Sequence, residues 1–212
     1  MIGLGITGAS VVEYLCNNGA QVAVTDSRFD PPYLAWLQQH YPNIEPLLGA
    51  ITVPLSITHI VLSPGVAINT LEIQQAIARG VIVLGDIELF AQSVDKPVVA
   101  VTGSNGKSTV TTLLGLMAQA SGLNPGIGGN LGTPALRLLN SKYDCYILEL
   151  SSFQLETLYS LHTKVVTLLN ISPDHMDRYS DLAAYLQAKQ RIFLNTEYAV
   201  VNRQDNLAAV PA

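Results

Sequence analysis

Charged residues are scarce in this 212-residue sequence: Asp, Glu, Lys and Arg make up 13% of it, roughly half of their share of about 25% in average soluble domains. The 11 basic and 16 acidic side chains leave a net charge of −5. That balance lacks the basic footprint of nucleic-acid binding, so we expect no nucleic-acid partner. Hydrophobic residues make up 49% of the chain, which excludes an intrinsically disordered protein because disordered chains are poor in apolar residues.

Cysteine is scarce as well, and no targeting segment is visible. Cys16 and Cys145 stand far apart, whereas small secreted proteins carry more cysteines at closer spacing. The first residues contain no basic region, so we expect no signal peptide. The uncharged stretch 108–136 is interrupted by Gly, Pro and Asn, unlike a membrane span of about 20 apolar residues. We therefore expect a cytoplasmic protein with reduced cysteines and no membrane partner.

What the sequence does contain is an alternation of short β-branched runs with helical segments, which starts twice. In the first series we expect strands over 21–25, 57–62 and 81–84. We expect helices from the end of the glycine turn 3–8 to about residue 18, from residue 31, and over 71–78. In the second series we expect strands over 98–101, 143–150, 164–169 and 198–201, and helices over 108–120 and 181–194. This order predicts an α/β fold with mostly parallel sheets.

A polar break at 95–97 separates the two series. We therefore expect a Rossmann-like domain over 1–93 and a second α/β domain over 94–212. Only Met1 and Ile2 precede the first glycine turn, where a whole strand normally stands. The chain also stops soon after its last predicted strand. Both ends predict a piece of a longer protein, with the first strand truncated and the second domain incomplete.

The strongest chemical motif follows the predicted strand 98–101, where a turn from Gly103 to Gly106 leads into Lys107, Ser108 and a helix. In a phosphate-binding loop, backbone N–H groups and a helix N-terminus surround phosphate oxygens. The lysine can reach the β- and γ-phosphates, and the serine hydroxyl can hold Mg²⁺. Two residues separate the glycines here, where the standard loop has four. An ordinary turn that happens to contain Gly-Lys-Ser is therefore the alternative.

A second glycine turn, Gly3-x-Gly5-x-x-Gly8, opens the first series, and Asp26 closes the strand that follows. This is the pattern of a dinucleotide-binding fingerprint, in which an acidic residue binds the ribose hydroxyls. The residues support a narrower prediction, a phosphate-bearing ligand near a helix N-terminus with Asp26 and Arg28 close by. A purely structural turn is the alternative.

Two more candidates follow predicted buried strands of the second series. Glu149 lies at the carboxyl end of the strand 143–150, where ligands bind in open α/β sheets and where a carboxylate can hold Mg²⁺. A helix cap or a buried ion pair is the alternative for it. His175 stands between Asp174 and Asp177, so it could join a metal site or serve a structural role.

Lys189 lies on the predicted helix 181–194, three and four residues after Leu186 and Tyr185. Its stem would run along an apolar face of that helix. A lone lysine on a helix is usually solvated, so spacing alone predicts an ordinary solvated lysine at this position.

Taken together, these segments resemble the Mur ligases of peptidoglycan synthesis. The resemblance is carried by Thr-Gly-Ser-Asn-Gly-Lys-Ser-Thr at 102–109, Leu-Glu-Leu-Ser-Ser-Phe-Gln-Leu at 148–155 and Asp-His-Met-Asp-Arg-Tyr at 174–179. The glycine turn and the segments 26–28, 63–65 and 85–90 resemble the same family, so the matching segments cover nearly the whole chain. The short phosphate loop is the form that this family uses. The resemblance is strongest to the members that add D-glutamate.

The resemblance implies a three-domain enzyme, of which this chain contains the UDP-substrate-binding domain and part of a P-loop-type ATP-binding domain. The third domain is absent, so we expect the segment alone to be inactive. The implied reaction uses ATP to convert the alanyl carboxylate of UDP-N-acetylmuramoyl-L-alanine into an acyl phosphate, which the amine of D-glutamate then attacks. The family also implies a monomer and Mg²⁺.

The resemblance further implies roles for individual residues. ATP would contact the phosphate loop, which comprises Gly103, Ser104, Asn105, Gly106, Lys107, Ser108 and Thr109. Mg²⁺ ions would be held by Ser108, Glu149, His175 and a carbamate on Lys189. Substrate-binding positions would be Ile6, Thr7, Asp26, Ser27, Arg28, Ser63, Gly65, Asn130 and Ser151. The catalytic residues would be Lys107, Asn130, His175 and Lys189.

Other functions fit the residues less well. An NAD-dependent oxidoreductase would leave the Gly-Lys-Ser motif and the segment 174–178 unexplained. A GTPase would carry an Asn-Lys-x-Asp motif to read guanine, and this sequence has none. A sister Mur ligase that adds another amino acid, or a non-catalytic nucleotide-binding module, remains as the alternative.

Overall fold

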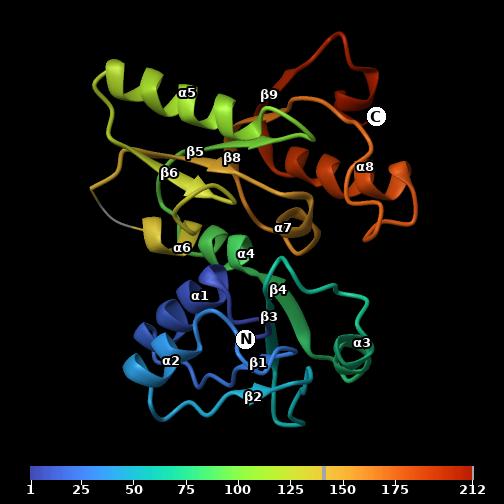
Figure 1. The fold of residues 1–212 in the computed structure, drawn as a ribbon. Coiled ribbons are helices and arrows are strands. Elements are labelled where there is room, and N and C mark those ends of the chain that lie inside the picture. The colour runs from blue at the N-terminus through green and yellow to red at the C-terminus, as the bar shows by residue number, and fades with distance from the viewer. Residues whose placement is uncertain (140–141, 212) are drawn as a thin grey trace. The chain divides into compact units, whose positions relative to one another are not determined.

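The computed structural model describes residues 1–139 and 142–211, which form two compact units, Met1–Asp86 and a second unit from Ile87 onward (Figure 1). Both units combine helices with parallel β-strands, as the sequence predicts. Within the part of the chain that the structure describes, no helix is long and apolar enough to cross a membrane. Residue 212, the last of the predicted second domain, lies outside the described residues.

The first unit is built around short parallel strands. Its elements in chain order are α1 (Ile6–Asn17), β1 (Thr25–Asp26), α2 (Leu34–His40), β2 (Leu47–Leu48), β3 (His59–Leu62), α3 (Leu71–Ala78) and β4 (Ile82–Gly85). β1 pairs with β2 and β3 pairs with β4. Ile2 forms parallel bridges to Thr25 and Leu62, which places it between β1 and β3. The expected Rossmann-like order is therefore present, with Ile2 at the position of a central strand.

The strand predicted over 21–25 is much shorter in the structure, where β1 spans Thr25–Asp26. A strand forms only where a neighbour supplies hydrogen bonds, and here the neighbour consists of Met1 and Ile2. The N–H of Thr25 donates to the carbonyl of Met1, and the N–H of Gly3 donates to the carbonyl of Thr25. Before β1, the carbonyls of Ala23 and Val24 still accept from the amino group of Met1 at 2.7 Å and from the N–H of Leu47 at 2.9 Å.

Two apolar clusters stabilise this unit. One packs Ile73 of α3 against Ile60 and Val83 of β3 and β4. The other joins Leu4 and Leu37 with α1 and the region of β1. Full burial of one such side chain contributes roughly 1.5–3 kcal/mol, so these clusters hold the helices on the short strands.

The second unit contains a five-stranded sheet in the order β6-β7-β5-β8-β9, with all neighbours parallel. Figure 1 shows α5 lying along one side of it. Its elements are α4 (Asp86–Ala91), β5 (Val98–Thr102), α5 (Lys107–Ala120), β6 (Pro125–Gly129), α6 (Ala135–Leu138), β7 (Cys145–Glu149), α7 (Ser152–Glu156), β8 (Thr163–Leu168), α8 (Leu182–Gln190), the 3₁₀ helix η1 (Arg191–Phe193), β9 (Thr196–Val201) and η2 (Asn206–Ala208). The central strands β5 and β7 are nearly all buried, which explains their continuous apolar runs.

Strand β6 is absent from the sequence-based prediction because Pro-Gly-Ile-Gly-Gly has low β propensity. Tertiary packing accounts for it, since a Cβ on Gly126 would lie 2.8 Å from the ring of Tyr146 on β7. A Cβ on Gly128 would collide with the carbonyl of Thr133. The glycines therefore allow β6 to lie close to its neighbours, at the cost of a recognisable strand pattern.

Helix α4 lies before the predicted boundary at residue 93, yet the compact second unit already begins at Ile87. Within that unit, the ring of Phe90 packs edge-on against Tyr146 with 5.1 Å between the ring centroids. Glu88 also accepts hydrogen bonds from backbone N–H groups that follow α7. These contacts assign α4 to the second unit. The polar segment 95–97, on which the predicted boundary rests, comes after this helix.

Candidate nucleotide and metal site

The predicted phosphate loop joins β5 to α5, and its backbone is fixed by glycine and by a neighbouring strand end. Gly106 has a φ of 79°, a left-handed conformation that favours glycine. The N–H of Ser104 donates to the carbonyl of Asn170 at 3.0 Å, and the N–H of Asn105 donates to the Asn170 side chain at 2.9 Å. The loop is thus tied to the residues after β8, at the N-terminus of a 14-residue helix that attracts anions.

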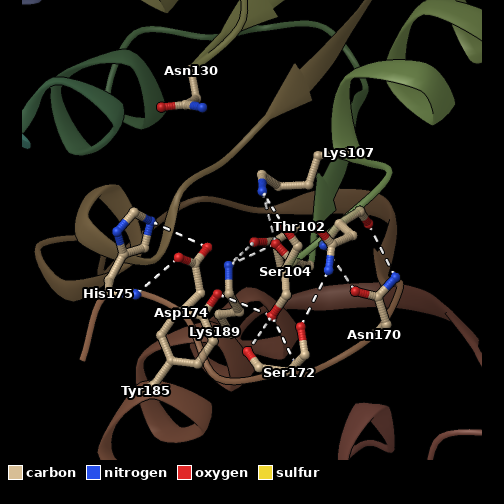
Figure 2. A network of polar contacts seen from close by, with 12 residues as sticks. Thr102, Ser104, Lys107, Asn130, Asn170, Ser172, Asp174, His175, Tyr185 and Lys189 are labelled. Carbon is tan, nitrogen blue, oxygen red and sulfur yellow. Dashed lines mark hydrogen bonds and ion pairs between the residues drawn. The ribbon is translucent and has the colours of Figure 1, made fainter.

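The phosphate loop is also held by Asn170, Ser172 and Tyr185, to which the sequence-based prediction gave no role. The Ser104 hydroxyl donates to the carbonyl of Ser172 at 3.0 Å and lies 3.1 Å from the Tyr185 hydroxyl. Asn170 bonds to both the N–H and the carbonyl of Asn105 (Figure 2). Asn170 could have been identified from the sequence, since it follows a buried strand just as Glu149 does.

Lys107 is the first residue of α5, and its amine turns back over its own loop. The Nζ atom donates to the carbonyl oxygens of Gly103 at 2.9 Å and Ser104 at 3.0 Å, as Figure 2 shows. The charge is therefore held beside the groups that would surround a phosphate. An incoming phosphate could exchange these neutral acceptors for stronger charge-assisted hydrogen bonds.

Ser108 and Glu149 meet directly, although 41 residues separate them. The Ser108 hydroxyl donates to Glu149 Oε2 at 2.7 Å, and Asn130 Nδ2 donates to Glu149 Oε1 at 2.7 Å. The Glu149 side chain is buried at the carboxyl end of β7. The structure thus brings three predicted site residues together, from α5, the end of β6 and the end of β7.

This arrangement suits Mg²⁺, which binds through one or two protein oxygens and fills its other positions with phosphates and water. Ser108 and Glu149 supply two hard oxygen ligands next to the phosphate loop. Among residues 1–139 and 142–211, no group of three His, Cys, Asp or Glu side chains could hold a metal ion by itself. A cation here would therefore depend on the oxygens of a bound nucleotide.

Lys189 is buried, with only 2% of its surface exposed, so the spacing-based prediction of a solvated lysine is wrong. Helix α8 packs its Nζ against the phosphate loop, where it donates to the carbonyl of Gly103 at 2.9 Å. Burial, together with the nearby charge of Lys107, lowers the pKa of Lys189 to about 7, while Asp174 and Glu149 oppose the shift. A large fraction of this amine is therefore neutral near pH 7.

His175 lies in the segment between β8 and α8, beside Asp174. Its Nε2 is 3.5 Å from Asp174 Oδ2, and its ring packs against Phe153 with 4.8 Å between the centroids. Its backbone φ of 55° is uncommon for a residue other than glycine. Asp174 also acts electrostatically on Lys189, so His175 and Lys189 share a carboxylate neighbour (Figure 2).

Ser151 caps the N-terminus of α7. Its hydroxyl accepts from the N–H of Gln154 at 3.2 Å, while the Gln154 side chain accepts from the N–H of Ser151 at 3.1 Å. This reciprocal pair is a capping box, which satisfies two backbone donors at a helix N-terminus. The sequence spacing Ser-x-x-Gln could have identified it.

The first unit has its own candidate site. The predicted substrate-binding residues lie where its parallel strands end or where α1 begins, namely Ile6, Thr7, Asp26, Ser27, Arg28, Ser63 and Gly65. Close packing requires glycine in the turn, because a Cβ on Gly8 would collide with the carbonyl of Gly3. That is the role of the third glycine in a dinucleotide-binding turn.

Asp26 organises this site. Its buried carboxylate accepts from the N–H of Leu4 at 2.7 Å and from the backbone and guanidinium of Arg28 at 2.7–2.9 Å. Burial alone would raise the pKa of Asp26, but the hydrogen bonds from Arg28 and Leu4 outweigh it and lower the pKa to about 2. Asp26 therefore stays ionised and fixes Arg28 beside the glycine turn.

We expect Asp26→Asn to lower the free energy of unfolding of the first unit by about 2 kcal/mol at pH 7, since a carboxylate with a depressed pKa stabilises its folded form. The pKa falls from 3.8 to about 2 on folding, so this contribution is complete above about pH 4 and is lost as the pH falls towards 2. Urea unfolding can be followed through Trp36, the one tryptophan, which packs in this unit.

Asp30→Asn is the matched control, because Asp30 is exposed nearby and its loss should leave the free energy of unfolding within about 0.5 kcal/mol of wild type. A destabilisation by Asp26→Asn that is as large at pH 3 as at pH 7 would contradict the assigned pKa.

Two family models match this chain. The model described as "Mur ligase MurD-like, N-terminal domain" matches residues 1–85, and the "Mur ligase middle domain" model matches residues 101–211. The first match covers the glycine turn and Asp26, and the second covers the phosphate loop and Lys189.

Among curated relatives, the UDP-N-acetylmuramoylalanine--D-glutamate ligase of Pseudomonas savastanoi pv. phaseolicola is 53% identical over 98% of this chain and 47% of its own length. The ligase of the same name from Methylococcus capsulatus is 50% identical over 99% of this chain and 46% of its own length. The chain therefore spans about half the length of the curated relatives that it matches.

Solved structures share the fold. The UDP-N-acetylmuramate:L-alanyl-gamma-D-glutamyl-meso-diaminopimelate ligase from Neisseria meningitides matches with a TM-score of 0.60 and 18% identity, over 97% of this chain and 71% of that chain. The UDP-N-acetylmuramate-alanine ligase from Thermotoga maritima matches with a TM-score of 0.55 and 22% identity, over 97% and 49%. These matches confirm the predicted fold class.

Proposed function

The chain belongs to the Mur ligase family, and we propose that the full-length protein is an ATP-dependent ligase that joins D-glutamate to UDP-N-acetylmuramoyl-L-alanine. Relatives named for that reaction align with nearly all of this chain at 50–53% identity. The observation that carries the proposal is a phosphate loop whose carbonyls hold the Lys107 amine and whose helix carries Ser108 in its first turn, hydrogen-bonded to Glu149. This is the arrangement that phosphoryl transfer from ATP requires.

The reaction has an electrostatic problem, because the carboxylate of one substrate must approach the negatively charged γ-phosphate of another. Lys107 would move from the carbonyls of its loop to the β- and γ-phosphates and offset part of that charge. Mg²⁺ held by Ser108 and Glu149 would neutralise further charge on the transferring group. Asn130, which bonds to Glu149 at 2.7 Å, would orient this carboxylate and contact the substrate near its reacting end.

The bond changes follow from that arrangement. A carboxylate oxygen of the alanyl group attacks the γ-phosphorus, the bond to the β-phosphate oxygen breaks, and ADP leaves. The amine of D-glutamate then attacks the acyl carbon of the acyl phosphate, expels phosphate and loses a proton. The net result is one amide bond, with ATP converted to ADP and phosphate.

Lys189 would act as a carbamate in this scheme. Its neutral amine adds to carbon dioxide and releases one proton, which leaves an anionic carbamate. The ammonium form must first lose one further proton. The low pKa of Lys189 favours the amine form that this addition needs. The carbamate and His175 would then serve a second Mg²⁺ on the side of the loop that Asp174 lines.

The division of labour follows the two compact units. The first unit would bind the UDP end of the substrate through the glycine turn, Arg28 and Ser63, and the second unit would bind ATP. The full-length protein would act as a cytoplasmic monomer without a nucleic-acid or membrane partner.

A substrate-dependence assay tests the proposed function. In the full-length protein, phosphate release from ATP should require UDP-N-acetylmuramoyl-L-alanine and D-glutamate together, with omission of either lowering the rate at least about 100-fold, because the acyl phosphate turns over only when an amine attacks it. Phosphate should be measured with L-alanine, L-lysine or diaminopimelate in place of D-glutamate. Equal rates with any of these would reject D-glutamate and favour a sister ligase.

A further inference from the structure

Between α7 and β8 lies a connection, residues 157–162, whose backbone is held by side chains from other parts of the second unit. The N–H groups of Tyr159 and Ser160 donate to Glu88 at 2.7 and 3.0 Å. The carbonyl of Leu158 accepts from Arg191, and the carbonyl of Tyr159 accepts from Asn195 at 3.2 Å. Irregular backbone needs such partners, because unpaired polar groups are costly when buried.

Glu88 is one of these partners and lies on α4. Only 4% of its surface is exposed, and besides the two backbone groups its carboxylate accepts from the Ser160 hydroxyl at 2.6 Å and the Gln92 side chain at 3.2 Å. Burial alone would raise the pKa of Glu88, but the bonds from Ser160 and Tyr159 outweigh it and lower the pKa. A buried carboxylate with four donors is a strong fixed anchor.

Arg191 is the other charged partner and begins η1, directly after α8. Its guanidinium donates through Nε to the carbonyl of Leu155 at 2.7 Å and through Nη2 to the carbonyl of Leu158. It also lies over the Tyr159 ring, with 5.3 Å to the centroid. A guanidinium that binds two carbonyls at the end of α7 is a planar, directional link that a lysine cannot reproduce.

Arg191 and the helix that it binds are close in sequence to the site. Arg191 lies two residues after Lys189, and α7, whose end it binds, begins three residues after Glu149. Helices α7 and α8 also pack on each other. Arg191 therefore joins the element that carries the buried amine to the element that follows the carboxylate, and Glu88 fixes the segment to which Arg191 is attached.

We propose that Arg191 and Glu88 are positioning residues for Lys189: they brace the 157–162 connection and so hold the amine of α8 against the phosphate loop. This inference rests on the proposed function. Without the Arg191 link, α8 could shift relative to Gly103, whose carbonyl lies 2.9 Å from the Lys189 amine. Misplacement of a site group by about 1 Å can cost up to 100-fold in rate.

The test is Arg191→Lys in the full-length protein, with Arg203→Lys as control because Arg203 is exposed in the same unit. We expect kcat to fall about 10- to 100-fold while the KM for ATP stays within about twofold, since the phosphate loop itself is unchanged. The ¹³C NMR signal of a lysine carbamate, obtained with labelled bicarbonate, should weaken. Hydrogen exchange should quicken in 157–162 and also in α8.

A wild-type kcat and carbamate signal in Arg191→Lys would overturn the proposal, even if the variant were less stable, because a purely structural brace predicts that result. Should Arg191→Lys fail to fold, Glu88→Gln makes the same test, since it keeps one acceptor oxygen and should lower kcat about 3- to 10-fold. If the wild-type enzyme released phosphate without D-glutamate, that result would instead contradict the proposed function. Hydrogen exchange in α8 of the variant would still test whether Arg191 holds this helix in place.

Discussion

We expect Lys107→Ala to lower the ligation rate of the full-length protein at least about 1000-fold, the size of effect seen when a cation at a transferring phosphoryl group is removed. The amine already lies within 3.0 Å of two loop carbonyls, so it needs only a small movement to meet a phosphate. Alanine removes the charge and leaves the γ-phosphate and the substrate carboxylate to repel each other. Both the binding of ATP and the transfer step should suffer.

The same substitution should leave the affinity for UDP-N-acetylmuramoyl-L-alanine within about threefold of wild type, because Lys107 belongs to the second unit and groups that share no partner contribute independently. In our proposal the first unit binds the UDP end, through residues around Asp26 and Arg28. Calorimetric titration of the substrate onto the variant measures that affinity without turnover.

Lys164→Ala is the matched control for Lys107→Ala. Lys164 forms an exposed ion pair with Glu197, and exposed pairs contribute about 0–1 kcal/mol, so the ligation rate of this variant should equal that of wild type. If Lys107→Ala abolished substrate binding together with ligation, the division of labour between the two units would be contradicted.

The parts of the fold that the sequence predicts well are those whose pattern is local. Helix α3 spans the predicted residues 71–78, and α5 begins one residue before the predicted start. Buried parallel strands such as β5 are recognisable because both of their faces are apolar. The phosphate loop then follows from the order of strand, glycines, lysine, hydroxyl and helix, which is itself a local pattern.

The parts that the sequence does not reveal depend on partners distant in the chain. The burial of Lys189 results from its contact with Gly103, 86 residues away, and helical spacing carries no information about that contact. The same holds for Glu88, whose donors Tyr159 and Ser160 lie more than 70 residues further on. Family resemblance could predict a role for Lys189 because it compares whole sites. It also includes the segment 85–90, but it assigns no role to Glu88 there, and it does not include Arg191.

Lys189→Ala should lower kcat about 100- to 1000-fold, since it removes the group that would become an anionic metal ligand inside the site. The substitution also leaves a space beside Gly103 and Thr102, which the amine now contacts. A small carboxylate could enter that space and supply the missing negative charge. Acetate at millimolar concentrations should therefore raise the rate of the variant about tenfold, measured as phosphate release under saturating substrates.

Two controls separate charge from volume in this rescue. Acetamide has nearly the shape of acetate but no charge, so it should not restore activity if the missing group is an anion. Lys189→Arg keeps a cation that cannot form a carbamate and fills the same space, so it should stay inactive with or without acetate. Equal rescue by acetate and acetamide, or an active Lys189→Arg, would show that Lys189 acts as a cation or as packing, because neither result needs a carboxylate at this position.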